Sequence, residues 1–292
     1  MPRIRPTLVL CLLPLLTGCL VHTHRVKQAK LPTIVRDATA DGLVQEVNRM
    51  NGGLQSLSAA VDFQASVGGA SKGKVTDYTA LSGFILLRKP DTVHVLGLVP
   101  VVRTRAFELA SDGKTFELLI PSQNKVIEGT NAVTKPSAHP LENLRPGLFF
   151  DAMILRRIGP ADLVTLTKAT ATHDTPGEQE SLSVPEYALS VVRRKENSQE
   201  LIPERVIHFS RVDLLPFRVE SYDQAGAVET EADYAGWEDF GGVQYPKTIT
   251  LKRPLEEYQI VITISKLTVN SELTDAQFEV KLPEGVQVQK LP

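Results

Sequence analysis

A long series of short segments that alternate apolar and polar residues constrains the fold of this chain most. The clearest is 257–267, in which Tyr258, Ile260, Ile262 and Ile264 share one face. Such segments follow one another at hairpin spacing without long helices between them, so we predict a mainly β (α+β) protein with an antiparallel sheet. The predicted strands are 57–67, 79–88, 92–99, 105–110, 115–120, 163–169, 186–194, 203–209, 217–222, 228–237, 246–252 and 257–267, with an exposed polar loop at 172–183.

Two segments have the spacing of helices instead. From Thr39 onward, apolar residues recur every three or four positions, and Thr39 or Asp41 can cap the start. Gly52-Gly53 predicts a kink or an end, because glycine weakens a helix. A second helical pattern covers 140–155, where Pro146 is expected to begin a new segment.

The first nineteen residues have a pattern of their own. Arg3 and Arg5 precede a mostly apolar run over 7–16, as in a secretory signal peptide. The run is too short to cross a membrane as a helix. It ends in Leu16-Thr17-Gly18-Cys19, which resembles the lipobox of bacterial lipoproteins.

This resemblance implies a lipoprotein signal peptide at 1–18 and an acylated Cys19 that anchors the chain to a membrane. Residue 20 is Leu, and the absence of Asp at this position favours the periplasmic face of the bacterial outer membrane. The stretch 19–37 has no clear periodicity, so we expect it to be the lipidated cysteine and a flexible tether. The remainder, 38–292, is expected to be one β domain.

Composition and motifs argue against catalysis, metal binding and nucleic-acid binding. Both cysteines, Cys11 and Cys19, lie in the leader, so neither a disulfide framework nor a thiolate zinc site is expected. The net charge is −2, so the chain has no excess of positive charge to attract nucleic acid. The stretch 68–74 has the spacing of a phosphate-binding loop, but Val75 follows instead of Ser or Thr, and we interpret it as a hairpin loop.

The histidines do not form a recognisable catalytic group in the sequence either. His94 and His208 lie in predicted strands, where we interpret them as structural or surface residues. A hydrolase would require one of them to join carboxylates at a pocket, and no motif in the sequence brings such a group together. We therefore predict no catalytic residue, no metal, no cofactor and no enzymatic activity.

Some predicted strands are apolar on both faces, as in 83–87, 201–202 and 206–209. Antiparallel sheets usually have one face exposed to water, so strands that are apolar on both faces need a cover on each. We therefore expect a curved sheet with a helix over its concave side. Incomplete filling of that side would leave an apolar cavity suited to acyl chains, whereas the alternative is a filled sandwich or barrel core. Alternation selects as candidate lining residues Phe63, Phe84, Leu86, Phe107, Phe116, Leu118, Phe149, Ile260 and Ile262.

Several turns and strands resemble the LolA/LolB-like family of lipoprotein carriers and receptors, over roughly residues 40–290. They include the amphipathic helix with 57–59, then 81–91, 107–113, 242–249, 273–278 and 282–286. The resemblance implies an open antiparallel β-barrel with a helical lid over a cavity for lipoprotein acyl chains. A receptor of this family carries a protruding apolar loop, for which the segment 98–102 is the candidate, and within it we single out Leu98 and Val99. An ordinary turn between two strands is the alternative.

Two hypotheses about function follow. The first is an outer-membrane-anchored periplasmic lipoprotein that binds or transfers lipids or lipoproteins, as a monomer, with a periplasmic carrier protein as a partner. The second is a non-enzymatic envelope binding module or stress sensor on the same fold. Copurified lipid would favour the first, and a single stoichiometric protein partner without lipid would favour the second.

Overall fold

The computed structural model describes residues 29–30, 34–131, 145–173 and 181–291. The predicted signal peptide, Cys19 and most of the tether lie outside the described residues, as does the centre of the predicted loop 172–183. Contacts divide the chain into a small unit, 1–33 and 171–184, and a large unit, 34–170 and 185–292. In the small unit, strand β1 (Ala29–Lys30) pairs in parallel with the first residues of β10 (Ser181–Arg194).

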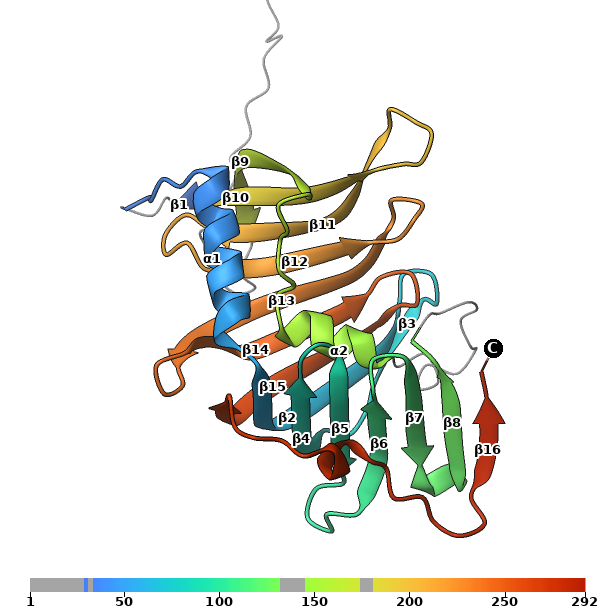
Figure 1. Cartoon of the computed structure of the whole chain (residues 1–292). Coiled ribbons are helices and arrows are strands. Elements are labelled where there is room, and N and C mark those ends of the chain that lie inside the picture. The colour runs from blue at the N-terminus through green and yellow to red at the C-terminus, as the bar shows by residue number, and fades with distance from the viewer. Residues whose placement is uncertain (1–28, 31–33, 132–144, 174–180, 292) are drawn as a thin grey trace, which may run out of the picture. The chain divides into compact units, whose positions relative to one another are not determined.

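The large unit is built on one curved, open sheet (Figure 1). Its strands run in the order β10-β11-β12-β13-β14-β15-β2-β4-β5-β6-β7-β8-β16, with β3 paired to β2 and β9 to β10. Neighbours are antiparallel from β10 to β8, and β16 joins β8 in parallel. The predicted mainly β, antiparallel fold class is confirmed. The strands are β2 (Ser56–Gly69), β3 (Lys74–Asp77), β4 (Leu81–Arg88), β5 (Thr92–Leu98), β6 (Arg105–Ser111), β7 (Thr115–Ile120), β8 (Lys125–Thr130), β9 (Leu163–His173), β11 (Leu201–Ser210), β12 (Pro216–Tyr222), β13 (Val228–Asp239), β14 (Gln244–Arg253), β15 (Tyr258–Val269) and β16 (Gln287–Lys290).

Every predicted strand is present, with its ends shifted by a few residues. The strand predictions did not include the short strands β1 and β16. They also did not include β3, all of whose residues are exposed, or β8, where the adjacent Val126 and Ile127 are both fully buried and therefore do not alternate. The stretch 68–74 contains the predicted hairpin loop, which is confined to 70–73, because β3 returns antiparallel to β2 and pairs with Gly68 and Gly69. The predicted loop 172–183 is wrong at its ends, since β9 runs to His173 and β10 begins at Ser181.

Two helices lie across one face of this sheet, which we call the inner face (Figure 1). Helix α1 (Ala40–Gly53) begins where Thr39 Oγ1 accepts a hydrogen bond from the Gly42 amide at 3.1 Å, and it ends at Gly53 as predicted. Helix α2 (Pro146–Met153) starts at Pro146, also as predicted, and contacts β5, β6 and β14. No helix in the described part of the chain is long and apolar enough to cross a membrane.

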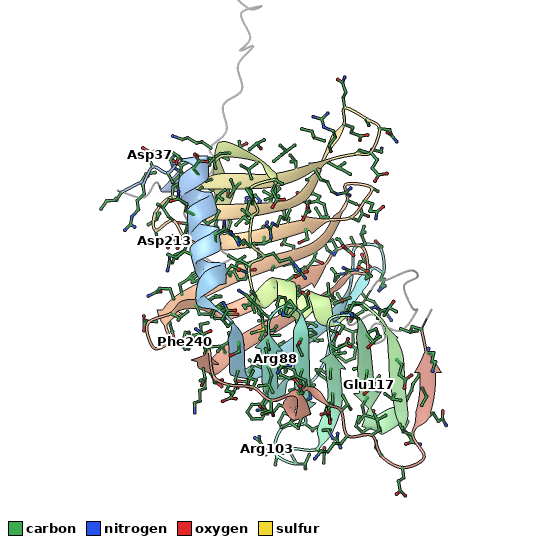
Figure 2. The ribbon with its side chains drawn as sticks, in the orientation of Figure 1. Asp37, Arg88, Arg103, Glu117, Asp213 and Phe240 are labelled. Carbon is green, nitrogen blue, oxygen red and sulfur yellow. The ribbon has the colours of Figure 1, made fainter. Side chains whose placement is uncertain are left out.

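The opposite, outer face of β4 and β5 is covered in part by the C-terminal segment. The short helix η5 (Asp275–Phe278) lies there, with the Arg88 guanidinium 4.8 Å from the centre of the Phe278 ring. Arg88 also donates to the Leu273 carbonyl at 2.8 Å, and the position of Arg88 is marked in Figure 2. Phe84, which also lies on the outer face of β4, is nevertheless 42% exposed.

Contacts with the sheet begin before the predicted domain boundary at residue 38. The Arg36 amide donates to the Arg211 carbonyl at 2.6 Å. The Asp37 carboxylate accepts from the Tyr187 hydroxyl at 2.9 Å and pairs with Lys168 and Arg211. The end of the predicted tether is therefore attached to the sheet just before α1 begins (Figure 2).

Candidate functional site

An apolar cavity of about 290 Å³ lies beside α2 on the inner face. Its volume is close to the lower end of the range for small-molecule sites. Strands β2, β4, β6 and β15 and helix α2 supply most of its wall. The lining residues are Phe63, Ala65, Ser66, Val67, Tyr78, Thr79, Leu81, Ala106, Phe107, Phe149, Tyr258, Gln259 and Ile260.

Two glycines position the aromatic part of this wall. Gly83 and Gly97 lie opposite each other on β4 and β5. A Cβ atom at Gly97 would lie 2.3 Å from the Phe107 ring, and one at Gly83 would lie 2.9 Å from the Phe63 ring. Because neither glycine has a side chain, the two rings can cover the strands and meet edge to face, with their centres 6.0 Å apart.

Four of the residues selected by alternation line this cavity: Phe63, Phe107, Phe149 and Ile260. Three others, Phe116, Leu118 and Ile262, are buried in the core but do not line it. The remaining two, Phe84 and Leu86, lie on the outer face of β4, because the inner positions are those of Gly83, Ile85 and Leu87.

The sequence analysis did not select the polar and small members of the wall. Tyr258 follows the same alternation as Ile260, so the pattern placed it on the correct face, although the candidate set did not include it. Its hydroxyl is buried and has no hydrogen-bond partner among the described residues. Burial raises the pKa of this phenol, so it stays protonated.

Two more cavities border α2. One of about 220 Å³ is lined mainly by apolar and aromatic residues, among them Met50, Met153, Tyr234 and Trp237. The other, of about 170 Å³, is more polar and includes Arg253 in its wall. Helix α2 therefore contributes residues to the walls of three cavities on the inner face.

Within the candidate loop 98–102, the exposed residues are not the two that the prediction singled out. Leu98 is buried and Val99 is half-buried, whereas Val101 and Val102, in the turn between β5 and β6, are 98% and 66% exposed. Hydrogen bonds from the Val102 amide to Pro100 and from the Arg103 amide to Val99 shape this turn. Figure 2 marks Arg103 at this end of the sheet. The exposed apolar pair of the candidate loop 98–102 is therefore Val101 and Val102, three residues beyond Leu98 and Val99.

His94 and His208 both have carboxylate neighbours on the outer face. His94 Nε2 lies 3.0 Å from Glu108 Oε1. His208 lies between Glu186 and Glu220, with nitrogen–oxygen distances of 3.5 and 3.8 Å. The described residues contain no group of three or more metal-ligating side chains with the geometry of a metal site.

The His208 group gives the clearest pH dependence. Burial disfavours the imidazolium, but Glu220 and Glu186 outweigh it and raise the pKa of His208. His208 and the Tyr222 hydroxyl, which donates at 2.6 Å, in turn lower the pKa of Glu220 to about 2. Stability from Glu220 is complete above pH 4.5 and is lost as the pH falls towards 2. Stability from His208 is complete below pH 6.5 and is lost as the pH rises through its higher folded pKa.

We therefore expect Glu220→Gln to lower the pKa of His208, because the nearby negative charge is removed. The substitution should also flatten the acid limb of the stability curve, by an amount on the order of 2 kcal/mol between pH 5 and pH 3. Titration of the His208 ring by NMR and unfolding at several pH values measure the two effects. Glu238→Gln, in an exposed pair with Lys247, is the control. An unchanged His208 pKa in Glu220→Gln would contradict the pairing.

Comparison with solved structures gives the relatives of this fold. The chain shares its fold with a DUF1329 family protein from Desulfovibrio piger. That match has a TM-score of 0.51 at 16% identity and covers 82% of this chain and 95% of the other. A LolA superfamily protein from Nitrosomonas europaea matches with a TM-score of 0.48 at 12% identity, over 84% of this chain and 99% of the other.

An outer membrane lipoprotein-sorting protein domain from Vibrio parahaemolyticus matches with a TM-score of 0.46 at 13% identity, over 82% of this chain and 97% of the other. No protein-family model matches the sequence, and no curated protein sequence matches it significantly.

Proposed function

We propose that this protein is a non-enzymatic periplasmic lipoprotein, anchored to the outer membrane through Cys19, that binds acyl chains of lipids or lipoproteins. The apolar cavity beside α2 carries the proposal, because its wall is mostly hydrocarbon and the rings of Phe63, Phe107 and Phe149 line it. The lipobox supports the anchor, and the resemblance to LolA/LolB-like proteins supports the ligand class.

The cavity offers enough apolar surface for useful affinity. Each buried methylene group contributes about 0.8 kcal/mol, so about ten of them contribute about 8 kcal/mol before the cost of immobilising the chain. A gross gain of that size corresponds to binding in the micromolar range or weaker. Such affinity suits a protein that accepts and releases its ligand.

Native mass spectrometry of the full chain carrying Cys19→Ser tests the proposal, because this variant cannot be acylated. We expect copurified lipid, or binding of palmitate and of a synthetic diacylated peptide after delipidation. A protein that is free of lipid and ignores both ligands would contradict the proposal. A single stoichiometric protein partner without lipid would instead support a binding module or sensor.

Val101 provides a test of contact with membranes. This β-branched residue has a φ of 68°, a left-handed conformation that costs about 1–2 kcal/mol, and its side chain is almost fully exposed. We expect Val101→Asn to raise the free energy of unfolding by about 1 kcal/mol, because asparagine tolerates this conformation. The same change should weaken binding to lipid vesicles about three- to tenfold, because a buried valine contributes about 1.5 kcal/mol or less.

Vesicle sedimentation and urea unfolding measure the two effects of Val101→Asn. Val75→Asn is the matched control, since Val75 is an exposed valine on β3 that does not have a positive φ. Equal losses of vesicle binding in both variants would show that the turn has no special role.

A further inference from the structure

We propose that the apolar cavity beside α2 takes one acyl chain of about ten carbon atoms, which enters through a mouth at Tyr78 and Thr79. The polar end of the ligand stays in solvent at this mouth. The ligand class is then a medium-length, single-chain amphiphile, such as a fatty acid or an acyl ester, and not a two-chain lipid held by both chains. This inference rests on the proposed function, because it requires that an acyl chain enters the cavity.

The volume of the cavity sets the length of the chain. A methylene group takes up about as much space as a water molecule in the liquid, about 30 Å³. The cavity of about 290 Å³ therefore holds about ten carbon atoms. A palmitoyl chain needs about 480 Å³, and two ten-carbon chains need about 600 Å³. Only part of a palmitoyl chain, and only one chain of a two-chain lipid, fits at a time.

Helix α2 is held in place, so the cavity keeps this volume. The Tyr245 hydroxyl donates to the carbonyl of the last residue of α2 at 2.7 Å. Two asparagines of α1 hold the segment that follows α2. Asn51 Nδ2 donates to the Leu155 carbonyl at 2.8 Å, and the Asn48 side chain both donates to and accepts from the Ile158 backbone, at 2.9 and 2.8 Å. Moving α2 away from the sheet to admit a second chain would break these buried or part-buried hydrogen bonds.

The exposure of the lining residues locates the mouth. Phe63, Phe107 and Phe149 are 4%, 8% and 1% exposed, so the cavity is closed to solvent where these rings lie. Tyr78 is 47% exposed, and Thr79 beside it is exposed as well. Both line the cavity and belong to the link between β3 and β4. The cavity therefore meets solvent at Tyr78 and Thr79.

The mouth is attached to β2 through the backbone of Tyr78. The Tyr78 amide donates to the Ala65 carbonyl at 2.9 Å, and the Gln64 side-chain amide donates to the Tyr78 carbonyl at 2.8 Å. A tyrosine suits this place, because its ring is apolar and its hydroxyl is polar. A charged or polar end group loses its hydration when it is buried without partners, so we expect the end group of the ligand to stay at the mouth.

The first test measures chain length. Calorimetry with the full chain carrying Cys19→Ser gives the affinities for octanoate, decanoate, dodecanoate and palmitate. From octanoate to decanoate, we expect the affinity to rise about three- to fourfold for each methylene group. From dodecanoate to palmitate, we expect a total rise below about threefold, whereas burial of all four added methylene groups would give about 200-fold.

The second test compares one chain with two. Monodecanoyl and didecanoyl phosphatidylglycerol, both below their critical micelle concentrations, have the same head group and differ by one chain. We expect their affinities to agree within about threefold, because only one chain is buried in either complex. Binding of the two-chain lipid that is 100-fold tighter would show that the protein holds the second chain as well.

The third test concerns the mouth and uses Thr79→Asp. A carboxylate there should weaken decanoate about three- to tenfold and leave decanol within twofold, because only decanoate carries a charge. Thr268→Asp is the matched control, since Thr268 is an exposed threonine near the other end of β15. It should leave both affinities unchanged. Equal effects of Thr79→Asp on decanoate and decanol would show that the end group lies elsewhere.

A continued rise in affinity up to palmitate would overturn the size limit, and tighter binding of the two-chain lipid would overturn the single-chain limit. Failure of the Cys19→Ser protein to bind any of the fatty acids is a different result. It would overturn the proposed function and this inference with it.

Discussion

Replacing Ala65 with tryptophan should abolish binding of acyl chains while leaving the fold intact. Ala65 lies on β2 opposite Ile260, between Phe63 and Val67 on the inner face, and its small side chain lines the cavity. An indole in this position would occupy much of the 290 Å³ that a ligand needs. Excluding even four methylene groups costs about 3 kcal/mol, so we expect at least an approximately 100-fold loss of affinity for palmitate.

The control for this substitution is Asp62→Trp. Asp62 lies on the same strand but on the outer face, where its side chain is exposed. The indole then adds the same bulk to β2 without entering the cavity, and palmitate binding should be retained. Equal loss of binding in both variants would show that disturbance of β2, rather than filling of the cavity, is responsible. Undiminished binding in Ala65→Trp would place the ligand elsewhere.

Gly83→Ala should destabilise the protein by about 3 kcal/mol or more, a large effect for a single methyl group. A Cβ atom at Gly83 would lie 1.9 Å from the Leu96 carbonyl oxygen, which belongs to the backbone of the paired strand β5. Backbone in a ladder cannot move aside without breaking hydrogen bonds on both of its sides. The same methyl group would press on the Phe63 ring, so the cavity wall would be displaced as well.

Urea unfolding measures this loss, and Gly52→Ala is its control. Gly52 lies in the last turn of α1, and a Cβ atom there would meet no atom within 4 Å. Alanine is the better helix former by about 0.5–1 kcal/mol, so this variant should be slightly more stable than the wild type. If Gly83→Ala unfolds at the same urea concentration as Gly52→Ala, the predicted clash between a side chain at position 83 and the backbone of β5 would be contradicted.

Alternation predicted the strands well where one face of the sheet is apolar and the other polar. Segment 257–267 is the best case, because its inner residues are buried and its outer residues are mostly polar. Alternation did not identify strand β3. All of its residues are exposed, so its side chains do not alternate between buried and exposed positions. Its pairing with β2 agrees with the hairpin loop that the sequence predicted at 68–74.

The candidate site was predicted in part, for a related reason. Periodicity assigns a side chain to a face, but it cannot say which buried side chains touch empty space. Phe63 and Ile262 are both buried on the inner face, yet only Phe63 borders the cavity. Phe84 was chosen by alternation within a segment that is apolar on both faces, but it lies on the outer face of β4 and is 42% exposed.

The pairing of β2 with β15 has a consequence for the time at which the protein can act. These strands are neighbours in the sheet, and Ala65 lies opposite Ile260 although the two are far apart along the chain. The hairpins β4–β8 and β11–β15 can each form from local contacts, but the seam between them closes only after β15 has been synthesised. Both walls of the seam border the cavity. A partly synthesised chain therefore lacks the complete cavity, which forms only when folding is nearly finished.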